Sequence, residues 1–145
     1  MARALQRITY VEDEPDIRAI ANLLLTQVGG FETDMCASGQ EALDRTGDFN
    51  PDLILLDVMM PRMSGFEVCQ KIKSDPASRD TAVIMVTALN EVPDYERAVE
   101  SGTDDFLSKP VNKIELLTRV KSLLRVRLLR KRLDALMSGP DQPGG

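Results

Sequence analysis

Short apolar runs alternate with stretches of helical periodicity along most of this chain. The runs that predict strands are Arg7–Val11, Glu32–Cys36, Leu53–Asp57, Ala82–Thr87 and Asp105–Leu107. The first, third and fourth are almost continuously apolar, which is typical of parallel strands covered on both faces. Strands that alternate with helices indicate right-handed βαβ units and a single parallel sheet.

The polar residues between the strands predict where the helices begin and end. The predicted helices cover about residues 15–28, 39–46, 65–73, 94–101 and 113–137. Three begin with a cap residue three positions before a glutamate, at Ser38, Ser64 and Asn112. Pro15 suits a first helical turn, and glycines at 29–30, 47 and 102 predict helix ends. The expected fold class is α/β: a (βα)5 doubly wound, five-stranded parallel sheet, flavodoxin-like, with an extended C-terminal fifth helix.

Length and composition exclude several classes of protein. The chain has 145 residues, enough for one domain with a sizeable core, and no apolar run approaches the ~20 residues of a membrane span. The N-terminus lacks the apolar stretch of a signal peptide, so a cytoplasmic location is expected. Because the chain has no histidine, it can hold neither a Ser-His-Asp triad nor an imidazole base nor a histidine zinc site. Cys36 and Cys69 are expected to be reduced and packed as small apolar residues.

Charged residues follow three of the predicted strands. Glu12 and Asp13 follow the first, Asp57 ends the third, and Lys109 follows the fifth. Ligands of open α/β sheets bind at this carboxyl edge. Three acids gathered there repel one another unless a cation joins them. The pattern therefore predicts a metal-assisted phosphoryl site.

Four segments carry a family resemblance. They are Val11-Glu12-Asp13-Glu14-Pro15, Leu55-Leu56-Asp57-Val58-Met59-Met60-Pro61, Val86-Thr87-Ala88 and Phe106-Leu107-Ser108-Lys109-Pro110. In this order and spacing they resemble the motifs of response-regulator receiver domains, the CheY-like modules of two-component signalling. From Ser64 to Leu124 the chain particularly resembles receivers attached to diguanylate cyclases. We expect a receiver domain over 5–125, a basic helical extension over 126–137 and a flexible tail over 138–145, either as a single-domain regulator or as part of a longer protein.

The resemblance implies a role for each residue of the site. Asp57 is the expected phosphoacceptor, and Thr87 and Lys109 would contact the phosphoryl group. Mg²⁺ is the implied cofactor, with Glu12, Asp13, Asp57 and the main-chain carbonyl of Met59 as its ligands. A cis peptide bond before Pro110 would direct Lys109 inward.

The resemblance also implies a conformational switch. Thr87 would move toward the phosphate while Phe106 turns inward, and the small Ala88 would leave room for the donor. Met59 and Leu89 lie two residues after Asp57 and Thr87, where they offer no group that could orient an attacking water. The sequence therefore predicts slow loss of the phosphoryl group.

Three functions remain open at this point. The leading one is a phosphorylation-dependent switch, which takes its phosphoryl group from a histidine kinase or a histidine phosphotransfer protein. It would promote its own phosphorylation and dephosphorylation without being an enzyme for another substrate. The alternatives are a receiver-like interaction module that needs no phosphate, and a haloacid-dehalogenase-like phosphatase. The phosphatase would need a second acid where Met59 stands.

The predicted fifth helix continues beyond the expected end of a receiver. Residues 1–111 carry 10 basic and 20 acidic residues, whereas residues 112–145 carry 8 and 3. A second apolar stripe with a/d spacing lies in this extension, displaced by about 200° from the core-facing stripe; its members are Val126, Leu129, Leu133 and Leu136.

Several uses of this extension stay open: a short coiled-coil stalk, a helix packed on an acidic surface, a membrane or nucleic-acid contact, or a frayed end. A nucleic-acid or membrane partner is disfavoured, because no aromatic residue accompanies the basic cluster and the rest of the chain is acidic. A homodimer could form through this helix, or through the fourth helix, fifth strand and fifth helix with Asp104, Asp105, Glu115 and Arg119.

Overall fold

The computed structural model describes residues 5–88 and 92–138, with side chains of 92–95 left out. Five strands alternate with five helices in the order β1(Arg7–Val11), α1(Pro15–Leu23) with the π-helical turn η1(Leu24–Val28), β2(Glu32–Cys36), α2(Gly39–Phe49), β3(Leu53–Asp57), α3(Gly65–Ser74), β4(Ala82–Thr87), α4(Val92–Ser101), β5(Asp105–Ser108) and α5(Lys113–Met137). The predicted α/β fold class, including the long fifth helix, is confirmed.

All strands are parallel, and their order in the sheet is β2-β1-β3-β4-β5. The chain therefore starts at an inner strand, builds one edge with β2 and then crosses to the other side of β1. This reversal of strand order places the carboxyl ends of β1 and β3 next to each other. Such a switch point is where open α/β sheets bind ligands.

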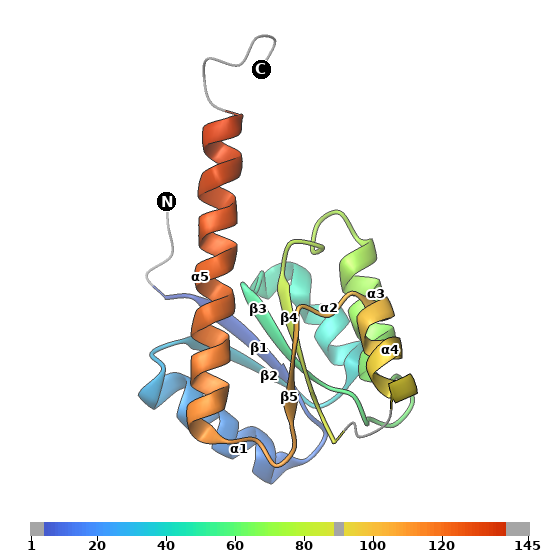
Figure 1. Ribbon diagram of the computed structural model, residues 1–145. Coiled ribbons are helices and arrows are strands. Elements are labelled where there is room, and N and C mark those ends of the chain that lie inside the picture. Colours follow the sequence, from blue (N-terminus) through green and yellow to red (C-terminus); the bar gives the residue numbers. More distant parts are fainter. Residues whose placement is uncertain (1–4, 89–91, 139–145) are drawn as a thin grey trace.

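Helices cover both faces of the sheet, as the apolar strands require (Figure 1). On one face α1 and α5 pack over a core that includes Ile8, Leu55 and Ile84. On the other face α2, α3 and α4 pack over a core that includes Ile54 and Met85. The two cores leave every residue of β3 and β4 buried, so both strands rigidly support the residues at their carboxyl ends.

Four of the five predicted helix starts, those of α1, α2, α3 and α5, are confirmed. The side-chain oxygens of Ser38, Ser64 and Asn112 each accept the backbone N–H three residues later, at 3.1, 3.4 and 3.0 Å. Pro15 occupies the first turn of α1, with Glu14 at the N-cap position and without a side-chain cap bond. Glycines with positive φ follow two helices, Gly30 at 74° and Gly102 at 92°.

Some predicted helix and strand boundaries were wrong. The predicted helix 15–28 changes from α to π at Leu24, where the Gly29 N–H donates to the Leu24 carbonyl at 2.9 Å. Helix α2 does not stop at Gly47 but runs to Phe49, because Asn50 takes the left-handed conformation with φ 52° that ends it. Helix α3 ends one residue later than predicted, α4 begins two residues earlier, and β5 includes Ser108.

Helix α5 is anchored along its first half and continues as a single helix to Met137. Leu116, Val120 and Leu124 are its buried residues, and Leu117, which is partly buried, packs against the same core. The division into receiver, extension and tail stays a prediction, and the expected tail lies outside the described residues beyond Ser138. Across residues 5–88 and 92–138, no helix is long and apolar enough to cross a membrane.

Candidate functional site

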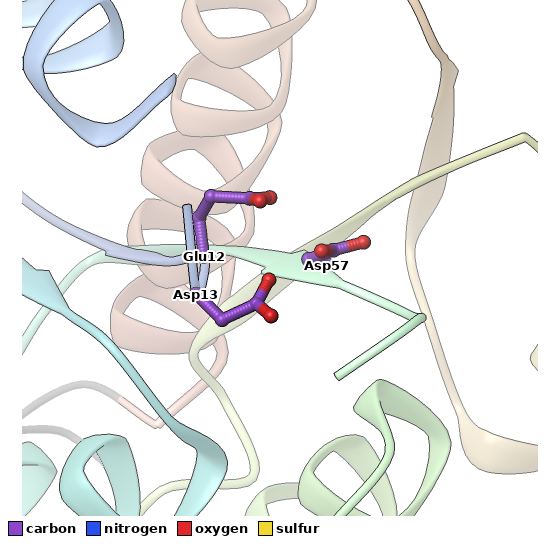
Figure 2. A group of neighbouring side chains, drawn as sticks. All are labelled: Glu12, Asp13 and Asp57. Carbon is purple, nitrogen blue, oxygen red and sulfur yellow. The ribbon is translucent and has the colours of Figure 1, made fainter. Parts of the chain in front are cut away.

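The sheet register brings the predicted acids together. Val11 pairs with Leu56, so Glu12 and Asp57 leave neighbouring strands at the same level. The N–H of Glu12 also donates to the Cys36 carbonyl at 3.0 Å, which extends the pairing with β2 by one residue. Glu12, Asp13 and Asp57 each offer an oxygen within 4.8 Å of the others. Figure 2 shows the three carboxylates turned toward a common space.

Asp57 is held in one orientation at the end of β3. Its side chain is 1% exposed, and its Oδ1 lies 3.1 Å from Lys109 Nζ. The same oxygen accepts the Met59 N–H at 3.2 Å. Its other oxygen, Oδ2, is buried without a hydrogen-bond donor in the described structure. Because buried carboxylate oxygens are normally paired, Oδ2 has the capacity to bind a cation.

Lys109 reaches the acids from the loop after β5. The Lys109–Pro110 peptide bond is cis, as the resemblance implied. The Lys109 N–H donates to the Thr87 carbonyl at 2.9 Å, which ties this loop to the end of β4. Its Nζ lies 3.6 Å from Glu12 Oε2 as well as 3.1 Å from Asp57. A single ammonium therefore faces two buried carboxylates.

This imbalance of charge changes the acid–base behaviour of the site. Burial, followed by the close approach and the negative charge of the Asp57 carboxylate, raises the pKa of Glu12 to about 7. Burial alone would lower the pKa of Lys109, but Asp57 and Glu12 outweigh it and raise that pKa. Tyr10, buried beneath the acids, has its phenol pKa raised mainly by burial. The site thus holds more negative charge than Lys109 neutralises.

Thr87 and Phe106, the predicted switch residues, share one face of the sheet. Met85 pairs with Phe106 and Thr87 with Ser108, and side chains two residues apart on a strand point to the same side. Thr87 is buried at the carboxyl end of β4, and Phe106 is partly buried against the core of the α3 and α4 face. The two side chains therefore lie on the same face of the sheet, and their switch roles stay predictions.

Met59 and Leu89 are the residues expected to flank the attacking water. Met59 is 75% exposed, and its backbone N–H donates to Asp57 Oδ1, so an exposed apolar side chain stands next to the site. Leu89 lies outside the described residues. Ala88, the small residue after Thr87, is exposed.

Sequence reasoning missed three supports of the site. Arg18 Nη1 donates to the Glu12 carbonyl at 2.7 Å, and the Glu14 N–H donates to Glu12 Oε1 at 3.4 Å. Gly65 begins α3 directly against β3, where an added Cβ would lie 2.5 Å from the Asp57 carbonyl oxygen. A glycine at the first position of a capped helix was a signal of close approach that could have been used.

The raised pKa of Glu12 predicts that stability without metal falls between about pH 4.5 and pH 7. In this window the folded state keeps a proton that the unfolded chain has released, so unfolding becomes easier as pH rises. Urea unfolding in EDTA at pH 5 and pH 8 measures the effect. Because other carboxylates titrate too, the comparison is with Glu12→Gln, which should lose part of the pH dependence. Mg²⁺ should stabilise wild type more at pH 8 than at pH 6. An identical pH slope in Glu12→Gln would contradict the assignment.

Comparison with known proteins shows which family shares this sequence. A family model described as the response regulator receiver domain matches residues 8–121. Over 124 residues, covering 85% of this chain, the sequence is 41% identical to response regulator PleD of Caulobacter vibrioides. Over 140 residues, covering 94% of the chain, it is 34% identical to the DNA-binding dual master transcriptional regulator RpaA of Synechocystis sp.. The matches span only 27% and 58% of those two relatives.

The fold has close neighbours among solved structures. A CheY-like response regulator receiver domain protein from Methanospirillum hungatei superposes with a TM-score of 0.81 at 27% identity, covering 88% of this chain and 99% of that one. Sequence and structure comparisons therefore agree on the same kind of domain.

Proposed function

Because this chain belongs to the response regulator receiver family of two-component signalling, we propose that Asp57 accepts a phosphoryl group and that this modification switches the surface offered to partners. The observation that supports the proposal most is the state of the Asp57 carboxylate. Lys109 and the Met59 N–H hold one oxygen in place, while the other is buried without a donor. A fixed carboxylate with one free oxygen is suited to attack phosphorus.

In the proposed reaction Asp57 forms a new O–P bond as the bond from phosphorus to the donor breaks. With acetyl phosphate the leaving group is acetate, and with a phosphohistidine it is the imidazole of the donor protein. Since residues 1–145 contain no histidine, such a donor lies outside them, on a histidine kinase or a histidine phosphotransfer protein. Lys109 pairs with a phosphoryl oxygen, and the Thr87 hydroxyl donates to another as the charge on these oxygens grows.

The acid cluster fits a bound Mg²⁺. Glu12 Oε2 is buried without a hydrogen bond among the described residues, and Glu12, Asp13 and Asp57 each offer an oxygen within 4.8 Å of the others. Mg²⁺ binds few protein carboxylates and keeps several waters. We propose Glu12, Asp13, Asp57 and the Met59 carbonyl as the residues that hold it. When bound, it would neutralise the acids and the incoming phosphoryl oxygens.

Signal output is proposed to depend on Thr87 and Phe106. Once the Thr87 hydroxyl turns to the phosphoryl group, Phe106 can fill the space left on the same face of the sheet. Phenylalanine has no hydroxyl to display, so the change would reach partners through packing. Dimerisation through α4, β5 and α5 stays a proposal; within one chain Arg119 already pairs with Asp105 at 3.0 Å, while Asp104 pairs with Lys73 at 2.8 Å.

Incubation with acetyl phosphate and Mg²⁺, followed by intact-mass measurement, tests the function. We expect a gain of one phosphoryl group that is absent in EDTA. No gain in either condition would favour the alternative of an interaction module that needs no phosphate. Repeated turnover of the phosphate donor at an enzyme's rate would favour a phosphatase.

Phosphorylated Asp57 is expected to be long-lived. The exposed thioether of Met59 offers no hydrogen bond to a water aimed at the phosphorus. Met59→Asn should therefore speed phosphate loss several-fold, while Met59→Leu, similar in volume and equally apolar, should leave the rate unchanged. Phosphate loss is followed by intact mass after removal of acetyl phosphate. A wild-type half-life of seconds, or equal rates in the Asn and Leu variants, would contradict the prediction.

A further inference from the structure

The C-terminal half of α5 presents an apolar stripe that the domain does not use. The stripe consists of Val126, Leu129, Leu133 and Leu136, which are 47%, 54%, 58% and 81% exposed. Figure 1 shows the last turns of α5 standing clear of the sheet and of the other helices. The spacing of three and four residues makes a narrow seam of the kind that packs against one other helix.

Arg127 fixes which way this stripe faces. Its Nη1 lies 3.1 Å from Asp52 Oδ1 at the start of β3, and its Nε donates to the Asp80 carbonyl at 3.1 Å. Both partners belong to the domain, so the Arg127 side of α5 is turned toward the sheet. Leu129 lies about 200° further around the helix. These two contacts of Arg127 therefore turn the stripe outward, where a partner can reach it.

Positive charge borders the stripe on both sides. With Val126 at position a and Leu129 at position d of a heptad, Arg125 and Arg132 fall at g and Arg130 at e. No ion pair of these three arginines occurs within residues 5–88 and 92–138. The guanidinium groups that would flank a docked helix are thus available to it.

A second copy of this helix is a poor partner for the stripe. In a parallel pair, Arg125 of one copy would face Arg130 of the other, because g contacts e′ of the following heptad. In an antiparallel pair e faces e′ and g faces g′, which again sets arginine against arginine. Like charges at these positions oppose pairing, whereas glutamates there would favour it.

An anionic membrane also suits the stripe less well. Residues 125–137 contain no aromatic residue to anchor at a lipid interface. The rest of the chain would be repelled by the same surface, since residues 1–111 carry 10 basic against 20 acidic residues. A single acidic helix avoids this repulsion because it contacts the extension alone.

We propose that the stripe of α5 is a docking surface for an acidic amphipathic helix of another protein. Leucine-like residues of that helix would cover Leu129 and Leu133, and its glutamates or aspartates would pair with Arg125, Arg130 and Arg132. The surface lies on the last turns of α5 and is distinct from the Asp57 site.

The test uses the whole chain and two fluorescent peptides of about three heptads. Both have leucine at a and d; one has glutamate at e and g, and the other has lysine. Fluorescence anisotropy should show binding of the glutamate peptide, weakened by salt, and at least about tenfold weaker binding of the lysine peptide. Equal binding of both peptides, or binding of neither, would overturn the proposal.

Matched leucines of α5 locate the surface. Leu129→Gln and Leu133→Gln should each weaken binding of the glutamate peptide about tenfold or more. Leu128→Gln is the control, because Leu128 is 44% exposed in the same helix but lies outside the stripe. Exchange of Arg125, Arg130 and Arg132 for glutamate should reverse the preference toward the lysine peptide. Circular dichroism checks that each variant keeps its helix.

Two further measurements distinguish the other occupants. Light scattering that shows a doubled mass in wild type, but not in Leu129→Gln, would assign the stripe to a second copy. Sedimentation with vesicles of phosphatidylcholine and phosphatidylserine, abolished by Leu129→Gln while neither peptide binds, would assign it to a membrane. Either result would replace the acidic helix as the partner.

Discussion

Asp57→Asn is expected to abolish phosphoryl uptake from acetyl phosphate while making the metal-free protein harder to unfold. Uptake is lost because the amide lacks the negatively charged oxygen that would attack phosphorus. Stability rises because Asp57 and Glu12 are both 1% exposed and, among the described residues, Lys109 is the one cation that pairs with them. The neutral amide removes the negative charge that helps raise the pKa of Glu12 to about 7. We expect a gain on the order of 1 kcal/mol in EDTA, roughly 2–4 °C in the melting temperature.

Asp52→Asn is the matched control for this experiment. Asp52 is also a buried aspartate, 6% exposed, but it directly precedes the first residue of β3, whereas Asp57 is the last. There it accepts the Arg7 N–H at 2.8 Å and pairs with Arg127. Its amide variant should therefore keep phosphoryl uptake and lose stability. Intact mass and thermal unfolding measure both effects. Uptake that survives in Asp57→Asn would identify another acceptor, and a lower melting temperature there would mean that the acids are well compensated.

Gly65→Ala is expected to destabilise the fold and to slow phosphorylation together. A Cβ at this position would lie 2.5 Å from the Asp57 carbonyl oxygen and 2.8 Å from the Val58 Cα. Both contacts are with backbone, so no side chain can rotate away, and the start of α3 must move from β3. Overpacking of this kind costs about 1–3 kcal/mol. The shift also strains the 3.0 Å bond from the Gly65 N–H to the Val58 carbonyl, next to the proposed acceptor.

Gly47→Ala serves as the control for the same chemical change. Gly47 lies inside α2, and an added Cβ would meet nothing within 4 Å. Alanine there should stabilise the helix by up to about 1 kcal/mol, because glycine loses more backbone entropy on folding. Urea unfolding of both variants, with the rate of mass gain from acetyl phosphate, checks the pair. Equal stability of the two variants would contradict the close approach of α3 to Asp57.

Local signals in the sequence were sufficient for most of the fold. Apolar runs such as Leu53–Asp57 form strands wherever both faces can be covered. Cap residues such as Ser38 begin helices by accepting the backbone N–H of the residue three positions later. The helix boundaries that were predicted wrongly depended on the backbone conformation of residues beyond the local signal. Gly47 was predicted to end α2, but the helix ends where Asn50 adopts a left-handed conformation, and glycine within a helix costs too little to decide the matter.

The sequence also predicted the residue types of the candidate site. Acids after β1 and β3 and a lysine after β5 were expected to meet because parallel strands end at one edge. The sequence did not show how the charges and hydrogen bonds of these residues are paired. That Lys109 faces both Glu12 and Asp57, that one oxygen of each acid is left without a donor, and that Arg18 supports the Glu12 backbone all depend on side-chain packing between distant segments.

The sequence by itself determined the order of strands and helices, the acids and lysine at the strand ends, and the basic, apolar extension after Leu124. These features arise from local periodicity and from residue chemistry. Only the tertiary structure decided that Gly65 must be a glycine, that Glu12 is buried enough to hold its proton up to about pH 7, and that Arg127 turns the stripe of α5 away from the domain. Close approach, burial and the direction of a helix face arise between segments far apart in the chain, so no local pattern could specify them.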